Sequence, residues 1–202
     1  MRGRGGVQGR LIAVDGCGPR IGAAAKLVAH DLRGVDARGA VSPWDASGIF
    51  TELAAAHDSG VPGPSARTLT LLYAADLAFR LRWQIRPALA EGRSVVAAPY
   101  VETAKALGIA AGLPRRWLEE IFRFAPRPDI CYHVADRRGP AAGGGPTGYG
   151  ERFLTAALSS LELLDPIQLR KRSADYLAAL ERRGICKRLP AGAAAALRSA
   201  RP

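Results

Sequence analysis

Short apolar runs alternate with helix-forming segments along most of the chain, and this alternation limits the folds that the sequence can adopt. The apolar runs, which predict strands, are residues 11–15, 39–41, 94–99, 129–134 and 185–189. The segments with apolar residues at helical spacing are 22–32, 45–57, 65–91, 101–111, 114–125, 151–164 and 166–183. Strands and helices in alternation favour a mainly parallel sheet with helices on both faces. We therefore predict an α/β protein, a three-layer αβα sandwich around a mainly parallel five-stranded sheet.

Three segments of unusual composition suggest the domain organisation. Residues 1–9 are basic and 191–202 are rich in alanine and arginine, so we expect flexible ends around one domain that spans 10–190. Residues 137–150 are rich in glycine, which predicts a mobile loop or lid. Within the long helical segment, Pro87 should bend or restart the helix.

The composition excludes several classes of protein. With 202 residues, 48% of them hydrophobic, the chain can bury a full-sized core and is neither a disordered tail nor collagen-like. It has no apolar run long enough for a membrane span or a secretory signal, so we expect a cytoplasmic protein with no membrane partner. Cys17, Cys131 and Cys186 are an odd number of widely spaced cysteines with apolar neighbours. This pattern predicts buried thiols rather than a disulfide framework or a zinc site.

The net charge of +11 comes from the ends of the chain. Residues 1–10 contain three arginines, and residues 170–188 contain seven basic and two acidic residues. The interior from 11 to 169 is nearly balanced, with 17 basic and 16 acidic residues. Basic segments can bind nucleic acid, but they are more often solvated faces. We therefore expect a nucleotide to be a possible ligand and nucleic acid to be an unlikely partner.

The turn after the first strand reads DGCGPRIGAA (15–24), where parallel α/β sheets place their ligand sites. A phosphate-binding P-loop needs G-x-x-x-x-G-K-[ST], because glycines let backbone N–H groups surround the phosphates while the lysine and the hydroxyl serve phosphate and magnesium. Counted from Gly16, the second glycine position holds Ile21, the lysine position Gly22 and the hydroxyl position Ala23. Three of the four positions thus lack the P-loop residue.

A dinucleotide-binding loop is the alternative interpretation of the same turn. Gly16, Gly18 and Gly22 have the spacing G-x-G-x-x-x-G, and Asp36 lies twenty residues after Gly16. Asp36 precedes the second predicted strand instead of ending it, so it is badly placed to reach a ribose. Arg20 is the cation within the loop, and with the three glycines it forms the candidate nucleotide-binding set. None of the histidines lies at metal-ligand spacing, so we predict no metal site.

Two longer segments resemble thymidylate kinases. LLYAADLAFRLRWQIRPALAEGRSVVAAPY (71–100) is similar to that family's succession of a leucine pair with an aromatic residue, alanine-aspartate-arginine, I-x-P-A-L-x-x-G and a strand ending in Asp-Arg-Tyr. FAPRPDICYHV (124–134) resembles the family's segment before its next strand, and the resemblance spans roughly residues 9–189. WDASGIF (44–50) stands where the family has its substrate-side loop. The resemblance implies a P-loop NTPase-like fold and, in an active member, ATP and magnesium.

The resemblance also identifies catalytic positions at which this chain differs. The family's arginine after alanine-aspartate is Leu77 here, and the aspartate and arginine of Asp-Arg-Tyr are Ala98 and Pro99. Tyr100 remains as the acceptor-side candidate, either stacked on a base or structural. Phosphoryl transfer depends on cations around the developing charge, so these losses remove much of the stabilisation. The cations that could compensate are Arg20 and, where the family carries lid arginines, Arg137, Arg138 and Arg152.

We therefore predict no catalytic residues and a thymidylate-kinase-like protein that acts as a non-catalytic nucleotide-binding, scaffolding or regulatory homologue. One alternative is a residual or altered kinase that uses ATP and magnesium to phosphorylate dTMP or a similar nucleotide. Another is a nucleic-acid-associated module that binds through its basic ends. If the chain dimerises as the resembled family does, we expect the apolar face of the 66–91 helix to contact a second copy or an active homologue.

Overall fold

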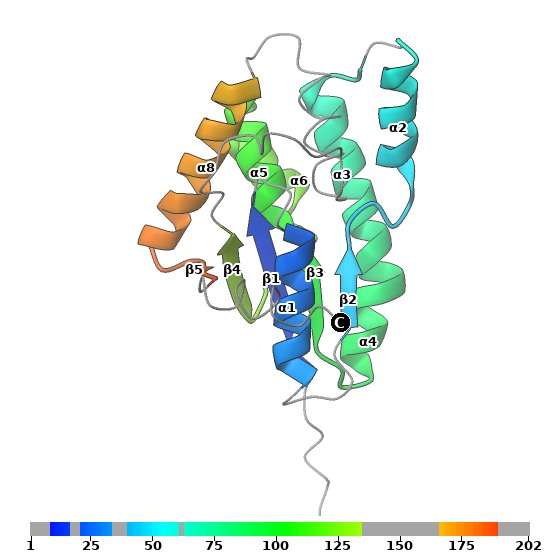
Figure 1. The fold of residues 1–202 in the computed structure, drawn as a ribbon, viewed down its shortest axis with the longest axis vertical. Helices are drawn as coiled ribbons and strands as arrows, with labels where there is room; N and C mark the ends of the chain where they lie inside the picture. The colour runs from blue at the N-terminus through cyan, green and yellow to red at the C-terminus, as the bar shows by residue number, and fades with distance from the viewer. Residues whose placement is uncertain (1–8, 17–20, 34–39, 61–62, 135–165, 190–202) are drawn as a thin grey trace, which may run out of the picture.

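A computed structural model of the chain describes residues 9–16, 21–33, 40–60, 63–134 and 166–189. Its centre is a parallel sheet of five strands in the order β2-β3-β1-β4-β5 (Figure 1). The strands are β1 (Leu11–Gly16), β2 (Ala40–Pro43), β3 (Val95–Ala98), β4 (Ile130–Val134) and β5 (Lys187–Arg188). The predicted α/β class and the five-stranded parallel sheet are confirmed.

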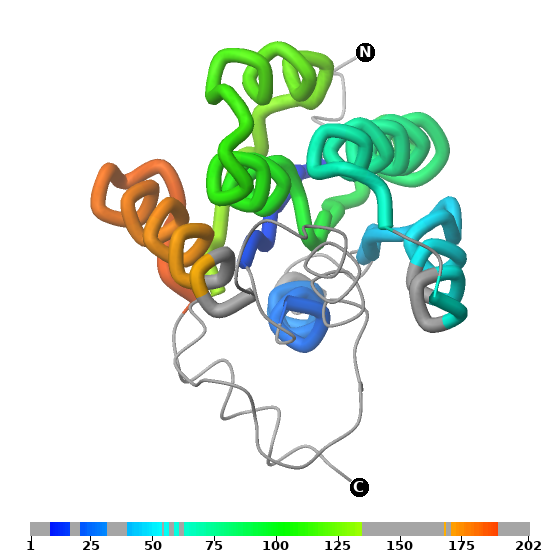
Figure 2. The backbone as a smooth tube through the Cα atoms, turned by 90° about the horizontal axis from the view of Figure 1, so that it is seen from above, coloured from blue at the N-terminus to red at the C-terminus, as the bar shows by residue number. Residues whose placement is uncertain are grey.

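Helices lie on both faces of the sheet (Figure 2). They are α1 (Ile21–Arg33), α2 (Ile49–Asp58), α3 (Ala66–Arg80), the π-helix η1 (Leu81–Ile85), α4 (Arg86–Ala90), α5 (Val101–Ala110), α6 (Arg115–Ile121) and α8 (Pro166–Arg182). Helix α1 covers one face, whereas α3, α5 and α8 lie on the other. The predicted three layers are therefore present in the described residues.

The first four residues of the central strand β1 are apolar and pack against the helix layers. Leu11 and Ala13 pack into the core beneath α3 and α5, while Ile12 and Val14 pack against α1. All four side chains are buried. A continuous apolar run of this kind is typical of a parallel strand that is covered on both faces, which is why the LIAV run predicts a strand without polar alternation.

The long helical segment is interrupted just before Pro87, close to where the sequence predicts a bend or restart. The backbone N–H of Arg86 bonds to the carbonyl of Leu81, five residues earlier, which makes one π-type turn. Proline has no N–H for the usual helical bond, and such turns let a helix continue past a local irregularity. The helix resumes as α4 and ends before Gly92, whose φ is 73°.

The prediction of three buried thiols is wrong for two of the cysteines. Cys131 of β4 and Cys186, just before β5, form a disulfide with an S–S distance of 2.04 Å. Strands β4 and β5 are neighbours in the sheet, which brings together residues 55 positions apart in the sequence. Spacing along the chain does not reveal such a pairing. Cys17 lies outside the described residues.

Several predicted segments also lie outside the described residues, namely 1–8, 137–150, 151–164 and 191–202. Other predicted boundaries differ by a few residues. The helix expected at 45–57 begins at Ile49, and the helix expected at 114–125 ends at Ile121. None of the described helices is long and apolar enough to cross a lipid bilayer.

Candidate functional site

The carboxyl ends of β1 and β3 meet the amino ends of α1 and α5, as expected for a ligand-binding edge of a parallel sheet. Strand β1 ends with Asp15 and Gly16 before α1 begins at Ile21. Strand β3 ends at Ala98 and is followed by Pro99, Tyr100 and then α5. This edge contains most of the described residues that the sequence singles out.

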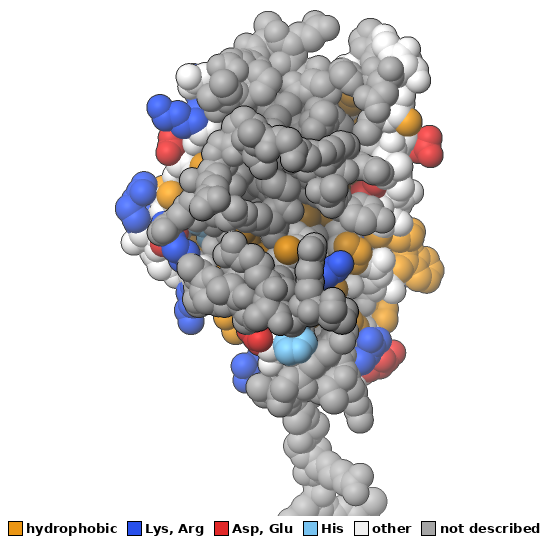
Figure 3. Space-filling view, in the orientation of Figure 1, with side chains coloured by type: hydrophobic (Ala, Val, Ile, Leu, Met, Phe, Trp, Pro, Cys, Tyr) orange, Lys and Arg blue, Asp and Glu red, His pale blue; other side chains and the backbone are white. Residues whose placement is uncertain are grey.

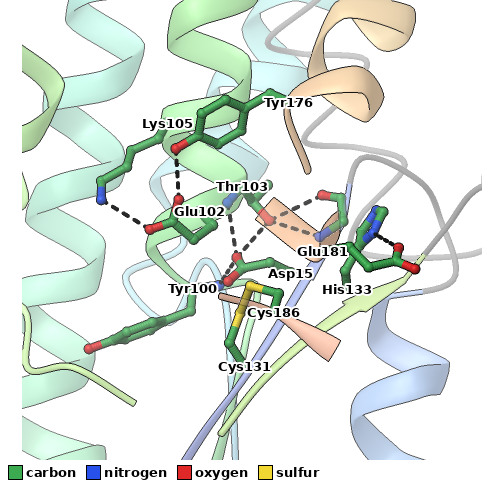
Figure 4. Close-up of a disulfide and its surroundings, with 11 residues drawn as sticks. Asp15, Tyr100, Glu102, Thr103, Lys105, Cys131, His133, Tyr176, Glu181 and Cys186 are labelled. Carbon is green, nitrogen blue, oxygen red and sulfur yellow. Dashed lines mark hydrogen bonds and ion pairs between the residues drawn. A yellow bond between two sulfur atoms is a disulfide. The ribbon is translucent and has the colours of Figure 1, made fainter. Parts of the chain in front are cut away.

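Asp15 joins the end of β1 to the first turn of α5 (Figure 4). Its Oδ1 accepts hydrogen bonds from the backbone N–H of Tyr100 at 2.8 Å and from that of Thr103 at 3.0 Å. The Thr103 hydroxyl donates to the same oxygen at 2.8 Å. Helices leave their first N–H groups without intrahelical partners, so the carboxylate caps α5 from a neighbouring strand.

The second carboxylate oxygen of Asp15 accepts no hydrogen bond from the described residues that would replace its contacts with water. Oδ2 is buried and has no hydrogen-bond partner among the described residues. Burial raises the pKa of Asp15 from 3.8 to about 6, against the hydrogen bonds from Thr103, which lower it, while the nearby Glu102 carboxylate adds to the rise. The end of β1 therefore carries a carboxyl group that is poorly solvated when ionised.

Gly16 is constrained by its neighbours, whereas Gly22 is not. The N–H of Gly16 donates to Thr103 Oγ1 at 3.0 Å, and a Cβ at this position would lie 3.0 Å from the carbonyl oxygen of Val134. Gly22 lies in the first turn of α1, where a Cβ would meet nothing within 4 Å. That first turn contains Ile21, Gly22, Ala23 and Ala24, so it has neither a cation nor a hydroxyl. Gly18 and Arg20 lie outside the described residues.

The buried Arg80 joins the ends of β2 and β3. Its Nε donates to Ser42 Oγ at 3.1 Å, and its two terminal nitrogens donate to the carbonyls of Ser42 at 2.7 Å and Pro99 at 2.9 Å. Burial lowers the pKa of Arg80, while Tyr73 and Asp76 oppose this change. Each of the three guanidinium nitrogens is bonded to the protein itself.

Asp76, one helical turn before Arg80, anchors the segment that follows β2. It accepts from the backbone N–H of Asp45 and from the N–H and hydroxyl of Ser47, each at 3.1 Å. Asp45, with a φ of 55°, in turn accepts from the N–H groups of Phe50 and Thr51 at the start of α2. The WDASGIF segment is therefore held by two carboxylates, and of Asp45 and Ser47, the two residues that the sequence offers for opening this helix, Asp45 bonds to its first N–H groups.

Two of the positions at which the resembled family is expected to carry charged residues hold buried apolar side chains. Leu77 and Ala98 are buried in the two hydrophobic cores. Tyr100 is also buried in the core, where its hydroxyl donates to the carbonyl of Pro126 at 2.8 Å and its own carbonyl accepts from the hydroxyl of Tyr73. Of the two roles considered for Tyr100, this environment fits the structural one.

The described residues bring together only part of the predicted site. The lid candidates Arg137, Arg138 and Arg152 lie outside them. No group of three or more His, Cys, Asp or Glu side chains able to hold a metal ion occurs in the part of the chain that the structure describes. The sequence analysis missed the roles of Arg80 and Thr103. An arginine between Phe79 and Leu81, four residues after an aspartate in an apolar helix, is the signal that could have indicated a buried polar network.

Comparisons with curated proteins find a partial similarity to probable thymidylate kinases. Segments of about 60 residues are 43% identical to probable thymidylate kinases of Pyrococcus horikoshii and Pyrococcus abyssi and 42% identical to that of Thermococcus gammatolerans. The matches cover 30% of this chain and 29–30% of the relatives' length, well under two thirds of it. No protein-family model matches the chain.

A solved structure resembles the fold along nearly its whole length. The crystal structure of thymidylate kinase from Ehrlichia chaffeensis superposes with a TM-score of 0.66, covering 96% of this chain and 99% of that chain. The two sequences are 12% identical over this range, so this likeness establishes the fold.

Proposed function

Since the chain is thymidylate-kinase-like in fold and in part of its sequence, as its motifs predict, we propose that it is a non-catalytic nucleotide-binding or scaffolding homologue. The observation that carries this proposal is the first turn of α1, which contains Ile21, Gly22, Ala23 and Ala24. A helix amino end attracts phosphate through its N–H groups, but transfer also needs cations and a magnesium ligand. The first turn of α1 supplies backbone donors alone.

The acceptor side supports the same proposal. A kinase must hold the phosphate of its acceptor in line with the donor, and misplacement by about 1 Å can cost roughly a hundredfold in rate. The buried Arg80 bonds through all three of its nitrogens to Ser42 and Pro99, so it is committed to the ends of β2 and β3. Neither Leu77 nor Ala98 offers a charge in its place.

The test is a pair of measurements on the purified full chain. With magnesium, ATP and dTMP, ADP formation should not exceed that of a buffer control, while ATP or dTMP should raise the midpoint of thermal unfolding if the nucleotide-binding form of the proposal is right. ADP formation within a hundredfold of an ordinary kinase would refute the non-catalytic proposal. An unchanged midpoint without turnover would restrict the proposal to scaffolding.

A double substitution in α1 sharpens this test. Gly22→Lys and Ala23→Ser restore the lysine and the hydroxyl at exposed positions, and a side chain at Gly22 meets no neighbour within 4 Å. Ile21 is kept because it is buried against the core. We expect tighter ATP binding with turnover still poor, since the acceptor side stays unchanged. The matched control is Gly22→Gln with Ala23→Ser, which keeps much of the bulk without the charge. Rapid transfer of phosphate from ATP to dTMP by the lysine variant would show that the acceptor site is intact.

A residual kinase remains the second candidate, because Arg20 and the lid arginines are present in the sequence. If any transfer occurs, Arg20→Ala should abolish it, since Arg20 is the cation within the loop sequence. Activity that survives this substitution would have to depend on other cations.

A second copy of the chain is the proposed partner of α3 and η1. Leu71, Phe79 and Trp83 are exposed on this helical segment, with 45%, 42% and 64% of their surface accessible. Exposed aromatic residues are typical of interface anchors. A non-catalytic copy could act through this face by pairing with itself or with an active homologue.

A further inference from the structure

Exposed cations gather on one edge of the molecule, on α8 and the outermost strand β5. Figure 3 shows Lys and Arg side chains along the side where Figure 1 draws these two elements. All of the following residues are exposed: Lys171, Arg172, Arg182, Arg183, Lys187 and Arg188. The structure thus gives the basic segment near 170–188 a defined position on one surface.

The carboxylates of this region do not neutralise it. Glu181 accepts from Arg188 at 2.9 Å and also contacts His133 at 3.3 Å, so it is occupied within the sheet edge. The other five of these six cations, of which Arg183 follows the end of α8, form no ion pair with any described residue. Elsewhere several basic side chains do have partners, as in Arg93 with Glu91, Lys105 with Glu102 and Arg123 with Glu120. Between residues 171 and 188 there are thus six exposed cations and two acidic residues, Asp175 and Glu181, so this edge carries excess positive charge.

The cations form a band rather than a point. Lys171 and Arg182 lie eleven residues apart on α8, which is close to three helical turns, so they project from the same side about 16 Å apart. Beyond the end of α8, Lys187 and Arg188 extend the band along β5, which has no strand on its outer side among the described residues. A ligand with regularly repeated negative charge can contact several of these groups at once.

We propose that α8 and β5 form a binding surface for the phosphate backbone of nucleic acid. Guanidinium groups match phosphate oxygens in pairs, and arginine contributes most of the cations here. A lipid surface is less suited, because membrane-bound helices also insert a broad apolar face. Ile185, 48% accessible, is the one large apolar side chain exposed between 171 and 189 in the described structure. Contacts of this kind carry no base specificity.

This proposal is independent of the nucleotide site, so each can fail without the other. The experiment titrates the full chain into a short fluorescein-labelled DNA duplex and into a single strand of the same length, at several salt concentrations. Counterion release predicts that the logarithm of affinity falls linearly with the logarithm of salt, with a slope of about 0.9 per phosphate contacted. The variant Arg182→Glu with Lys187→Glu should bind at least about tenfold more weakly and lower this slope by about two.

The matched control reverses the same amount of charge elsewhere. Arg116→Glu with Arg127→Glu alters two exposed arginines, on α6 and before β4, that belong to neither α8 nor β5. It should retain nearly the affinity and the slope of the unmodified chain, and circular dichroism should show that both variants are folded. Equal losses in both variants would show attraction by net charge alone and overturn the proposal. No binding at low salt, or binding to anionic phospholipid vesicles without binding to DNA, would also overturn it.

Discussion

Asp15 combines two opposing effects in one residue. Its Oδ1 satisfies two backbone N–H groups at the start of α5, which helps to hold that helix against β1. Its Oδ2 is buried without a partner among the described residues, and this raises the pKa of the group to about 6. A rise from 3.8 corresponds to about 3 kcal/mol between the two protonation states. The neutral form is therefore the one that favours folding.

This raised pKa predicts how stability changes with pH. Between about pH 4 and pH 6 the folded chain binds the Asp15 proton more tightly than the unfolded chain, so the contribution of Asp15 to the free energy of unfolding falls as pH rises. Asp15→Asn keeps an acceptor oxygen and removes the charge. Relative to the wild type, this variant should gain up to about 3 kcal/mol between pH 4 and pH 7.

Urea denaturation of both proteins across this pH range measures the difference. His133, whose pKa is lowered by burial, contributes equally to both proteins and cancels. Asp175→Asn, at an exposed position on α8, is the control for the change from carboxylate to amide at a solvated site. A difference between wild type and Asp15→Asn that does not vary with pH would contradict the prediction.

At the scale of elements, the edge of the sheet depends on a covalent link and on packing. Strand β5 has two residues, and it follows α8, whose Leu177 and Leu180 pack with Ala106 of α5 and with Cys186. The Cys131–Cys186 disulfide attaches this unit to β4, and Glu181 bonds to His133 beside it (Figure 4). Glu181 also accepts a hydrogen bond from Arg188. Such a short strand needs these additional contacts to stay paired.

Loss of the disulfide should therefore lower stability without removing the fold. It closes a loop with a sequence separation of 55 residues, and restricting such a loop in the unfolded chain contributes about 2–4 kcal/mol. Cys186→Ala should reduce the free energy of unfolding by this amount and make it insensitive to reductant. Urea denaturation with and without dithiothreitol measures both effects, and Cys17→Ser is the matched control. If the wild type were equally stable with and without reductant, the link would contribute nothing in solution.

At the scale of the whole molecule, the two exposed surfaces lie on different sides. The band of cations lies on α8 and β5 at one edge of the sheet, whereas α3 and η1 lie towards β2, at the opposite edge (Figures 1 and 2). Trp83 lies within the π-turn η1, and 64% of its surface is accessible. A second copy on α3 and η1 would therefore leave the cations of each chain accessible.

The proposed association predicts a clear effect of one substitution. Trp83→Glu places a charge in the apolar face and should convert a dimer into a monomer, since a buried unpaired charge is costly. Size-exclusion chromatography with light scattering measures the mass over a range of concentrations. Phe124→Glu changes another exposed aromatic residue, outside α3 and η1, and should leave the mass unchanged. A wild-type chain that is monomeric at every concentration would reject this interface.

Much of the architecture could be predicted from the sequence by itself, because strand and helix formation depends on local patterns. The buried run at Leu11–Val14, the helical spacing in 66–80 and the position of Pro87 each indicate their element within a few residues. The missing lysine and hydroxyl after Gly16 are also evident from spacing. These features need no knowledge of which segments lie side by side.

The pairing of distant groups was decided only by the tertiary structure. The strand order places Cys131 beside Cys186, and the meeting of β2 with β3 surrounds Arg80 with the carbonyls of Ser42 and Pro99. The same packing buries Tyr100 and leaves one oxygen of Asp15 without a partner among the described residues. A polar group is satisfied by whatever the fold brings near it, and those partners lie up to 118 positions away in the chain.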